Sequence, residues 1–177
     1  MRISTILADD KVRLSCEVFP PKKFDGIAQA CEVTREIAAL KPAYMSVTYG
    51  AAGSTPGHTL AVAKAVQDSG VTPLCHLTCV QSTKEHVQTV LSDMKAAGME
   101  NVLALRGDLP TTGEPCRDFA YASELVEFIH TQQFLTQADI TVHLVQVIVD
   151  SLDQIQVHRG GHIGPIQGRI QRGRILS

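Results

Sequence analysis

The sequence predicts an α/β fold made of parallel βα units. Four apolar runs bounded by turn residues begin about every 29 residues, at Leu14, Ala43, Val71 and Asn101. Between them lie segments with the three- and four-residue periodicity of amphipathic helices. The runs are apolar on both faces, which is typical of a parallel sheet covered by helices. Four such units take up about 130 of the 177 residues, whereas a closed eight-unit barrel needs about 250. An open doubly wound sheet and an incomplete barrel both fit.

Each predicted element has its own signals. Asp25 is the expected cap of the first helix, Gly70 ends the second, and Gly98 ends the third. Ser82-Thr83-Lys84-Glu85 resembles a capping box at the start of that third helix. The strands are expected at 14–19, 43–48, 71–80 and 101–105. The helices are expected at 25–40, 59–69, 82–98 and 121–132.

The composition of the chain argues against nucleic acid and membranes as binding partners. The formal net charge of −2 gives no basic field for nucleic acid, and no apolar run approaches the length of a membrane span. Pro20-Pro21-Lys22-Lys23 is therefore interpreted as an exposed loop. Five cysteines, an odd number, suit reduced thiols, and residues 1–10 lack the apolar region of a signal peptide. We expect a cytoplasmic protein that binds neither nucleic acid nor membranes.

Reactive side chains follow the apolar runs. They are Glu17, Thr48, His76, Arg106 and Asp108. Ligands of parallel α/β proteins bind beyond the carboxyl ends of the strands, so these side chains form a candidate site. The alternative is a set of ordinary strand exits. For Glu17 the two interpretations are a desolvated general acid and an exposed residue on an edge strand.

Two further patterns near these strand ends carry weaker signals. Cys75-His76-Leu77-Thr78-Cys79 lacks the spacing of a metal motif, so packed thiols are preferred and no metal is predicted. On a strand, Cys75, Leu77 and Cys79 would share one face, and His76 and Thr78 the other. Residues 50–54 are small enough for a ligand to approach closely, yet they match no nucleotide-binding motif. Asp108 either makes a local turn or ion pair with Arg106 or sets the charge around a cofactor.

Five segments in order resemble the methylenetetrahydrofolate reductase family over residues 1–130. They are Cys16-Glu17-Val18-Phe19-Pro20-Pro21-Lys22, Ser46-Val47-Thr48-Tyr49-Gly50-Ala51, His76-Leu77-Thr78-Cys79, Ala104-Leu105-Arg106-Gly107-Asp108-Leu109-Pro110 and Phe119-Ala120-Tyr121-Ala122-Ser123-Glu124-Leu125. The resemblance implies a partial (β/α)8 TIM barrel of about four βα units. It also implies FAD as cofactor, NADH or NADPH as co-substrate and a folate as substrate. The implied reaction converts 5,10-methylenetetrahydrofolate to 5-methyltetrahydrofolate, in one-carbon metabolism and methionine biosynthesis.

The resemblance also implies roles for individual residues. Glu17 matches the general acid that opens the substrate ring, and Asp108 matches a carboxylate near flavin and folate. The remaining FAD-contacting positions are matched by Thr48, His76, Leu105, Arg106, Gly107, Tyr121 and Ala122.

The sequence departs from the family beyond Ile129. The last Lys is Lys95 and the last Glu is Glu127, and the following residues are rich in Gln and then in Gly and Arg. The family's Tyr-Pro-Glu-x-His-Pro and Thr-Gln-Phe-Phe-Phe-Asp segments are missing. We interpret 131–177 as a divergent, poorly ordered tail and hypothesise a shifted reading frame. The alternative is a fifth βα unit with a strand within 140–149.

These departures lower the expected activity, because much of the flavin cradle is missing. We expect weak or no reductase activity from the chain as it stands. The alternative function is a non-catalytic truncated module that forms a homo-oligomer, or binds a full-length relative, through open sheet edges. A third hypothesis is an unrelated doubly wound binding protein.

Overall fold

The computed structural model describes residues 1–8, 11–49, 56–108, 118–131 and 141–143. These residues form a parallel sheet in which every strand pairs with the one before it, in the order β1-β2-β3-β4-β5. The strands are β1 (Ser15–Val18), β2 (Tyr44–Val47), β3 (Pro73–Thr78), β4 (Asn101–Leu105) and β5 (Thr141–His143). The four predicted βα units are confirmed, and the arrangement is that of a partial barrel.

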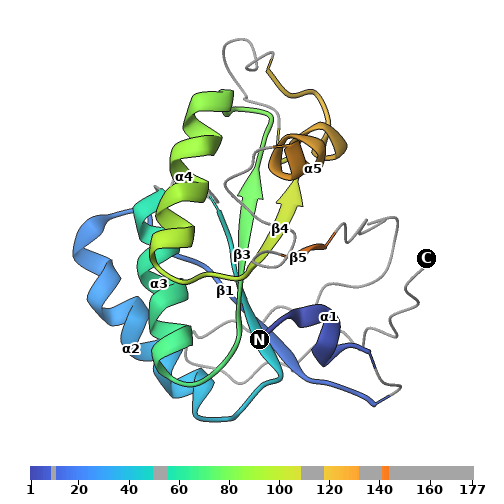
Figure 1. Cartoon of the computed structure of the whole chain (residues 1–177). Helices are drawn as coiled ribbons and strands as arrows, with labels where there is room; N and C mark the ends of the chain where they lie inside the picture. The colour runs from blue at the N-terminus through green and yellow to red at the C-terminus, as the bar shows by residue number, and fades with distance from the viewer. Residues whose placement is uncertain (9–10, 50–55, 109–117, 132–140, 144–177) are drawn as a thin grey trace.

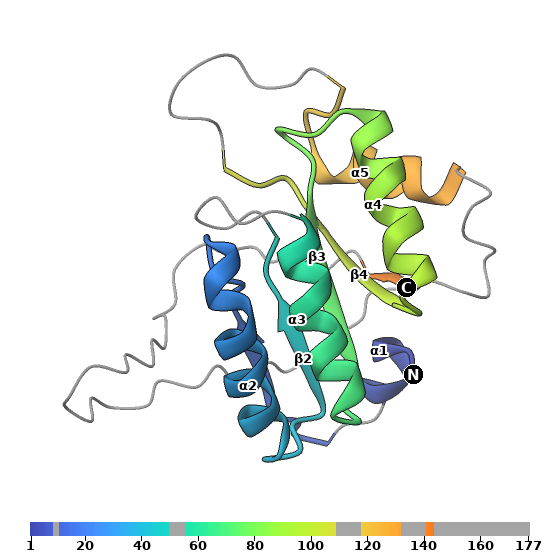
Figure 2. The ribbon, with the colours of Figure 1, turned by 90° about the vertical axis from the view of Figure 1, so that its left-hand side faces the viewer.

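One face of the sheet is covered by more helices than the other. α2, α3 and α4 cover one face, as Figures 1 and 2 show, and α1 lies on the other. The main core lies under the covering helices and includes Met45, Val47, Cys75, Leu77 and Val102, each completely buried. The helices are α1 (Ile3–Ile6), the 3-10 turn η1 (Phe24–Gly26), α2 (Ile27–Ala38), α3 (Pro56–Asp68), α4 (Lys84–Ala96) and α5 (Ala122–Thr131).

The helix ends follow local chemistry. Thr83 caps α4, because its hydroxyl accepts the backbone N–H of His86 at 3.1 Å. The predicted capping box is thus off by one residue, since the Ser82 hydroxyl donates to the carbonyl of Thr78 instead. Gly70 and Gly98 follow α3 and α4 with φ near +79° and +73°, as their predicted role at helix ends requires.

Two other predicted helix boundaries are wrong. Asp25 lies inside the 3-10 turn η1, and Gly26 takes the N-cap position of α2 without a side-chain bond. α3 begins at Pro56 rather than at Thr59, because a proline in the first turn forfeits no helical hydrogen bond.

The unpredicted helix α1 is anchored at the amino ends of the strands. The Asn101 amide oxygen accepts the N–H of Ile3 at 2.9 Å, and its NH2 group donates to the carbonyls of Met1 and Pro73. Ile3 and Ile6 then pack on Leu74 and Leu103 in a second, smaller core.

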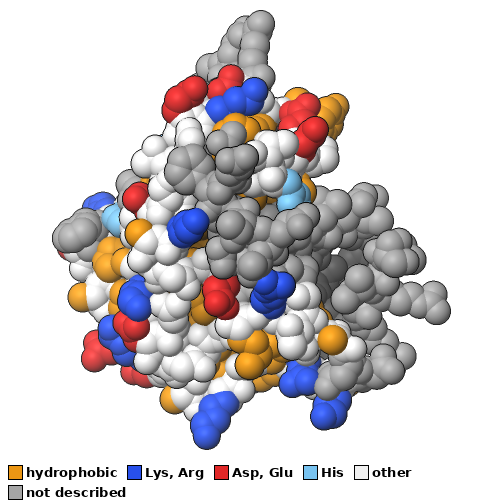
Figure 3. All heavy atoms as spheres, viewed as in Figure 1, with side chains coloured by type: hydrophobic (Ala, Val, Ile, Leu, Met, Phe, Trp, Pro, Cys, Tyr) orange, Lys and Arg blue, Asp and Glu red, His pale blue; other side chains and the backbone are white. Residues whose placement is uncertain are grey.

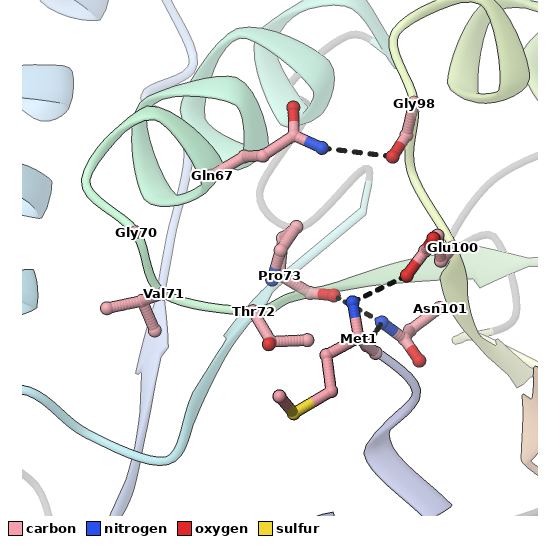
Figure 4. Close-up of a pocket in the computed structure, with 9 residues that line it drawn as sticks. All are labelled: Met1, Gln67, Gly70, Val71, Thr72, Pro73, Gly98, Glu100 and Asn101. Carbon is pink, nitrogen blue, oxygen red and sulfur yellow. Dashed lines mark hydrogen bonds and ion pairs between the residues drawn. The ribbon is translucent and has the colours of Figure 1, made fainter. Parts of the chain in front are cut away.

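A shallow cleft of about 330 Å³ lies beside this anchor (Figure 4). The Met1 ammonium contacts the Glu100 carboxylate at 2.6 Å, and Gln67 donates to the carbonyl of Gly98. The amino face of a parallel barrel usually serves stability, so this cleft is not the candidate site.

The tail prediction is only partly within the described residues. β5 pairs in parallel with β4, at Thr141–Asn101 and Leu103–His143, inside the range that the fifth-unit alternative gave for a strand. Residues 50–54, 109–117 and 144–177, with the reading-frame hypothesis for the tail, lie outside the described residues.

Among the described helices, none has the length and apolarity needed to cross a membrane. On the face drawn in Figure 3, Lys and Arg side chains lie among Asp and Glu side chains. This agrees with the low formal net charge of the chain.

Candidate active site

The face of the sheet opposite the covering helices carries the polar residues of the predicted site. Side chains alternate along a strand, so Cys75 and Leu77 enter the main core while His76 lies on the other face, as predicted. Glu17 on β1 is in register with Ser46 on β2. Because all strands are parallel, Glu17 and the Asp108 segment lie toward the same, carboxyl end of the sheet.

Glu17 has features of both interpretations of the sequence, because it is an exposed residue of an edge strand and its carboxyl group is also partly desolvated. It lies on the edge strand β1, and its side chain is 47% exposed. Its Oε2 accepts the Ser46 hydroxyl at 3.3 Å and lies 3.8 Å from Nε2 of His76. Burial raises the pKa of Glu17, and the Ser46 hydrogen bond opposes that rise. The carboxyl group therefore keeps its proton to higher pH than an ordinary glutamate does.

Two buried polar atoms on this face have no hydrogen-bond partner among the residues that the structure describes. They are Oγ1 of Thr48 and Nε2 of His76, in side chains that are 6% and 7% exposed. Burial also lowers the pKa of His76 to about 4, so the imidazole is neutral at pH 7. Buried polar atoms are nearly always paired in native proteins. Both atoms are therefore free to accept or donate a hydrogen bond on this face, and Nε2 of His76 also lies 3.8 Å from Oε2 of Glu17.

The segment after β4 exposes Arg106 and Asp108 to solvent. Nε of Arg106 donates to the carbonyl of Gly107 at 3.3 Å, and the Gln81 amide donates to the carbonyl of Asp108. Leu105, at the end of β4, is half-buried against the second core. Both charged side chains are thus at the carboxyl end of the sheet, as predicted.

Gly107 is required by the backbone at this exit. Its φ is +82°, and a Cβ at this position would lie 2.9 Å from Cβ of Thr78. We expect Gly107→Ala to lower the free energy of unfolding by about 2 kcal/mol, from left-handed strain and this clash. Urea unfolding of the variant measures this loss. Gly57→Ala, where nothing lies within 4 Å of the added Cβ, is the control, and equal stability of the two variants would contradict the prediction.

The predicted positions Tyr121 and Ala122 lie where α5 begins. Tyr121 is 64% exposed, and Ala122 is half-buried. The Glu124 carboxylate accepts the backbone N–H groups of Ala120 and Tyr121 and so fixes the helix start. Contact of these two residues with a flavin stays a prediction.

Ser46 is a site residue that sequence reasoning missed. It stands in the matched Ser46-Val47-Thr48-Tyr49 segment, yet only Thr48 was assigned a role. The available signal was alternation, because a residue two positions before Thr48 on a strand shares its face.

Comparison with known proteins agrees with this arrangement. The family model described as methylenetetrahydrofolate reductase matches residues 2–147, which extends beyond the predicted limit of 130. A "Probable methylenetetrahydrofolate reductase (NADH)" of Oryza sativa subsp. japonica is 35% identical over 136 residues, covering 74% of this chain and 23% of the relative. The "5,10-methylenetetrahydrofolate reductase" of Escherichia coli (strain K12) is 33% identical over 121 residues, covering 67% of this chain and 40% of the relative. The chain thus matches less than half the length of these relatives. Because the family model matches more than half of the chain, the chain belongs to the methylenetetrahydrofolate reductase family.

Proposed function

We propose that this chain forms part of a flavoprotein site that reduces 5,10-methylenetetrahydrofolate to 5-methyltetrahydrofolate, with NADH or NADPH as the source of electrons. The observation that carries the proposal is the pair of unpartnered buried atoms, Oγ1 of Thr48 and Nε2 of His76, beside a carboxyl group of raised pKa. Family membership supports folate reduction as the reaction. It does not favour the alternative of a non-catalytic association module.

The residues present fit FAD. A flavin ring offers carbonyl oxygens and ring nitrogens that can pair with Thr48 and His76, and its apolar rim suits the half-buried Leu105. The segment of Arg106, Gly107 and Asp108 offers a guanidinium and a backbone approach free of a Cβ. We assign Tyr121 and Ala122 to the same cofactor. When bound, FAD supplies the hydride chemistry, and the chain supplies binding, orientation and a proton.

Glu17 is the proposed proton donor. A carboxyl group whose pKa is raised by burial retains a proton closer to neutral pH. Transfer of that proton to a nitrogen of the substrate's five-membered ring opens the ring to an iminium, which is the form that accepts a hydride at carbon. Afterwards the carboxylate is stabilised by the Ser46 hydroxyl until it is protonated again.

Asp108 is proposed to set the charge near the cofactor. Its exposed carboxylate follows β4 at the same end of the sheet as Glu17. With FAD bound, the carboxylate of Asp108 would disfavour negative charge on the cofactor and so favour hydride donation to the substrate.

FAD binding tests the proposal directly. We expect the full chain to quench FAD fluorescence in a saturable titration. Thr48→Val should bind FAD about 5- to 30-fold more weakly, because about 1–2 kcal/mol of hydrogen bonding is lost.

Thr34→Val is the matched control for this titration. Thr34 is buried on α2, away from the polar face, and its hydroxyl donates to the carbonyl of Ala30. Absence of FAD binding, or equal affinity of the Thr48→Val and wild-type chains, would reject the proposal. Menadione-dependent oxidation of NADH by the same preparation then tests the expectation of weak activity.

A further inference from the structure

The Ser46 hydroxyl contacts one carboxyl oxygen of Glu17, the proposed proton donor. Ser46 lies on β2, the strand beside the edge strand β1, and is directly in register with Glu17. It is 8% exposed. Its Oγ donates to Oε2 of Glu17 at 3.3 Å. Nε2 of His76, two strands away from β1, approaches the same oxygen at 3.8 Å. Ser46 and His76 therefore both approach the same carboxyl oxygen of Glu17, Oε2.

This asymmetry matters for a general acid. A protonated carboxyl group has one O–H and one carbonyl oxygen, and only the carbonyl oxygen accepts a hydrogen bond well. The Ser46 hydroxyl can donate to Oε2 of the ionised carboxylate or accept an O–H from Oε2 of the protonated group, because a hydroxyl is both donor and acceptor. In both protonation states the Ser46 hydroxyl holds Oε2, so it fixes the orientation of the carboxyl group and stabilises its ionised form.

We propose that Ser46 is a positioning residue, whose hydroxyl holds Oε2 of Glu17, orients the carboxyl group and stabilises the carboxylate that remains after proton transfer. The catalytic meaning of this inference rests on the proposed function, whereas the Ser46–Glu17 coupling itself does not.

The other groups near Glu17 do not replace Ser46. From β3, His76 is neutral above about pH 4, because burial lowers its pKa to about 4. From β2, Thr48 shares the face of Ser46. From the segment after β4, Arg106 and Asp108 are exposed to solvent, which screens their charges. The hydroxyl of Ser46 is the group that donates to the Glu17 carboxylate within hydrogen-bond distance.

A side-chain carboxyl titration of Glu17, followed by carbon-13 NMR on the full chain, tests the coupling. In Ser46→Ala we expect Glu17 to titrate at a higher pH, because its charged form loses a hydrogen bond. Ser46→Thr keeps the hydroxyl and should restore the wild-type titration. Ser82→Ala, which removes another buried serine hydroxyl, should leave it unchanged. If Ser46→Ala does not fold, Ser46→Cys, a weaker donor of similar volume, gives the same direction of change.

Where the preparation turns over, kcat for folate reduction should fall about three- to tenfold in Ser46→Ala with KM unchanged, as expected for one lost hydrogen bond. An unchanged Glu17 titration in Ser46→Ala or Ser46→Cys overturns the inference, whether or not FAD binds. A shifted titration without FAD binding keeps the coupling but rejects the proposed function together with the catalytic role of Ser46. The two failures are thereby distinguished.

Discussion

Asn101→Ala is expected to lower the free energy of unfolding by about 3 kcal/mol, because three hydrogen bonds, two of them buried, end on one side chain that is 1% exposed. Truncation leaves the N–H of Ile3 and the carbonyls of Met1 and Pro73 without these partners. Urea denaturation followed by circular dichroism measures the loss.

Asn101→Asp provides a graded comparison. An ionised aspartate keeps the acceptor for the Ile3 N–H but donates nothing to the two carbonyls. Ser92→Ala removes a hydroxyl that bonds within α4 and should cost less than about 1 kcal/mol. If Asn101→Ala were no more damaging than Ser92→Ala, the amide would not anchor α1.

His76 is expected to make the fold sensitive to acid by up to about 3 kcal/mol. Its pKa is lowered from 6.5 to about 4 by burial, so the unfolded chain takes up the proton first as pH falls. Stability is therefore complete above about pH 6.5 and is lost as pH falls from there toward 4. Glu17 acts in the opposite sense, because its raised pKa favours the folded state when the carboxyl is protonated.

The comparison of His76→Gln with the wild type at pH 7 and pH 4.5 isolates this effect. In urea unfolding, the wild-type chain should lose clearly more stability between the two pH values than the variant. His130→Gln, an exposed position in the last turn of α5, controls for the loss of any histidine. Equal pH sensitivity of wild type and His76→Gln would mean that His76 takes up its proton as readily in the folded chain as in the unfolded one.

The sequence predicts the sheet well because apolar runs and helical periodicity are properties of contiguous residues. It fails for α1, because the four-residue helix has no pattern of its own and depends on Asn101, nearly one hundred residues away. The error at Ser82 has a similar cause. Both Ser82 and Thr83 are favourable N-cap residues, and although Glu85 completes the capping-box pattern with Ser82, the Ser82 hydroxyl bonds the Thr78 carbonyl and Thr83 caps the helix.

In the candidate site, too, the sequence predicts what local residue types determine and misses what depends on neighbouring strands. Residue types at strand ends pointed to Glu17, Thr48 and His76, and the structure brings these three to one face. Sequence reasoning did not find Ser46, because its importance comes from the inter-strand register with Glu17 and not from its neighbours in the chain. The side chain of Asp108 reaches the same end of the sheet, and its proximity to Glu17 stays a prediction.

The strictly sequential strand order has a consequence for how the chain folds during synthesis. Each new strand adds beside the one just made, so the sheet can assemble in the order in which its strands are synthesised. The first few residues are the exception, since their amide partner at position 101 is translated long after them. The docking of α1 on the sheet therefore has to wait until β4 has been synthesised.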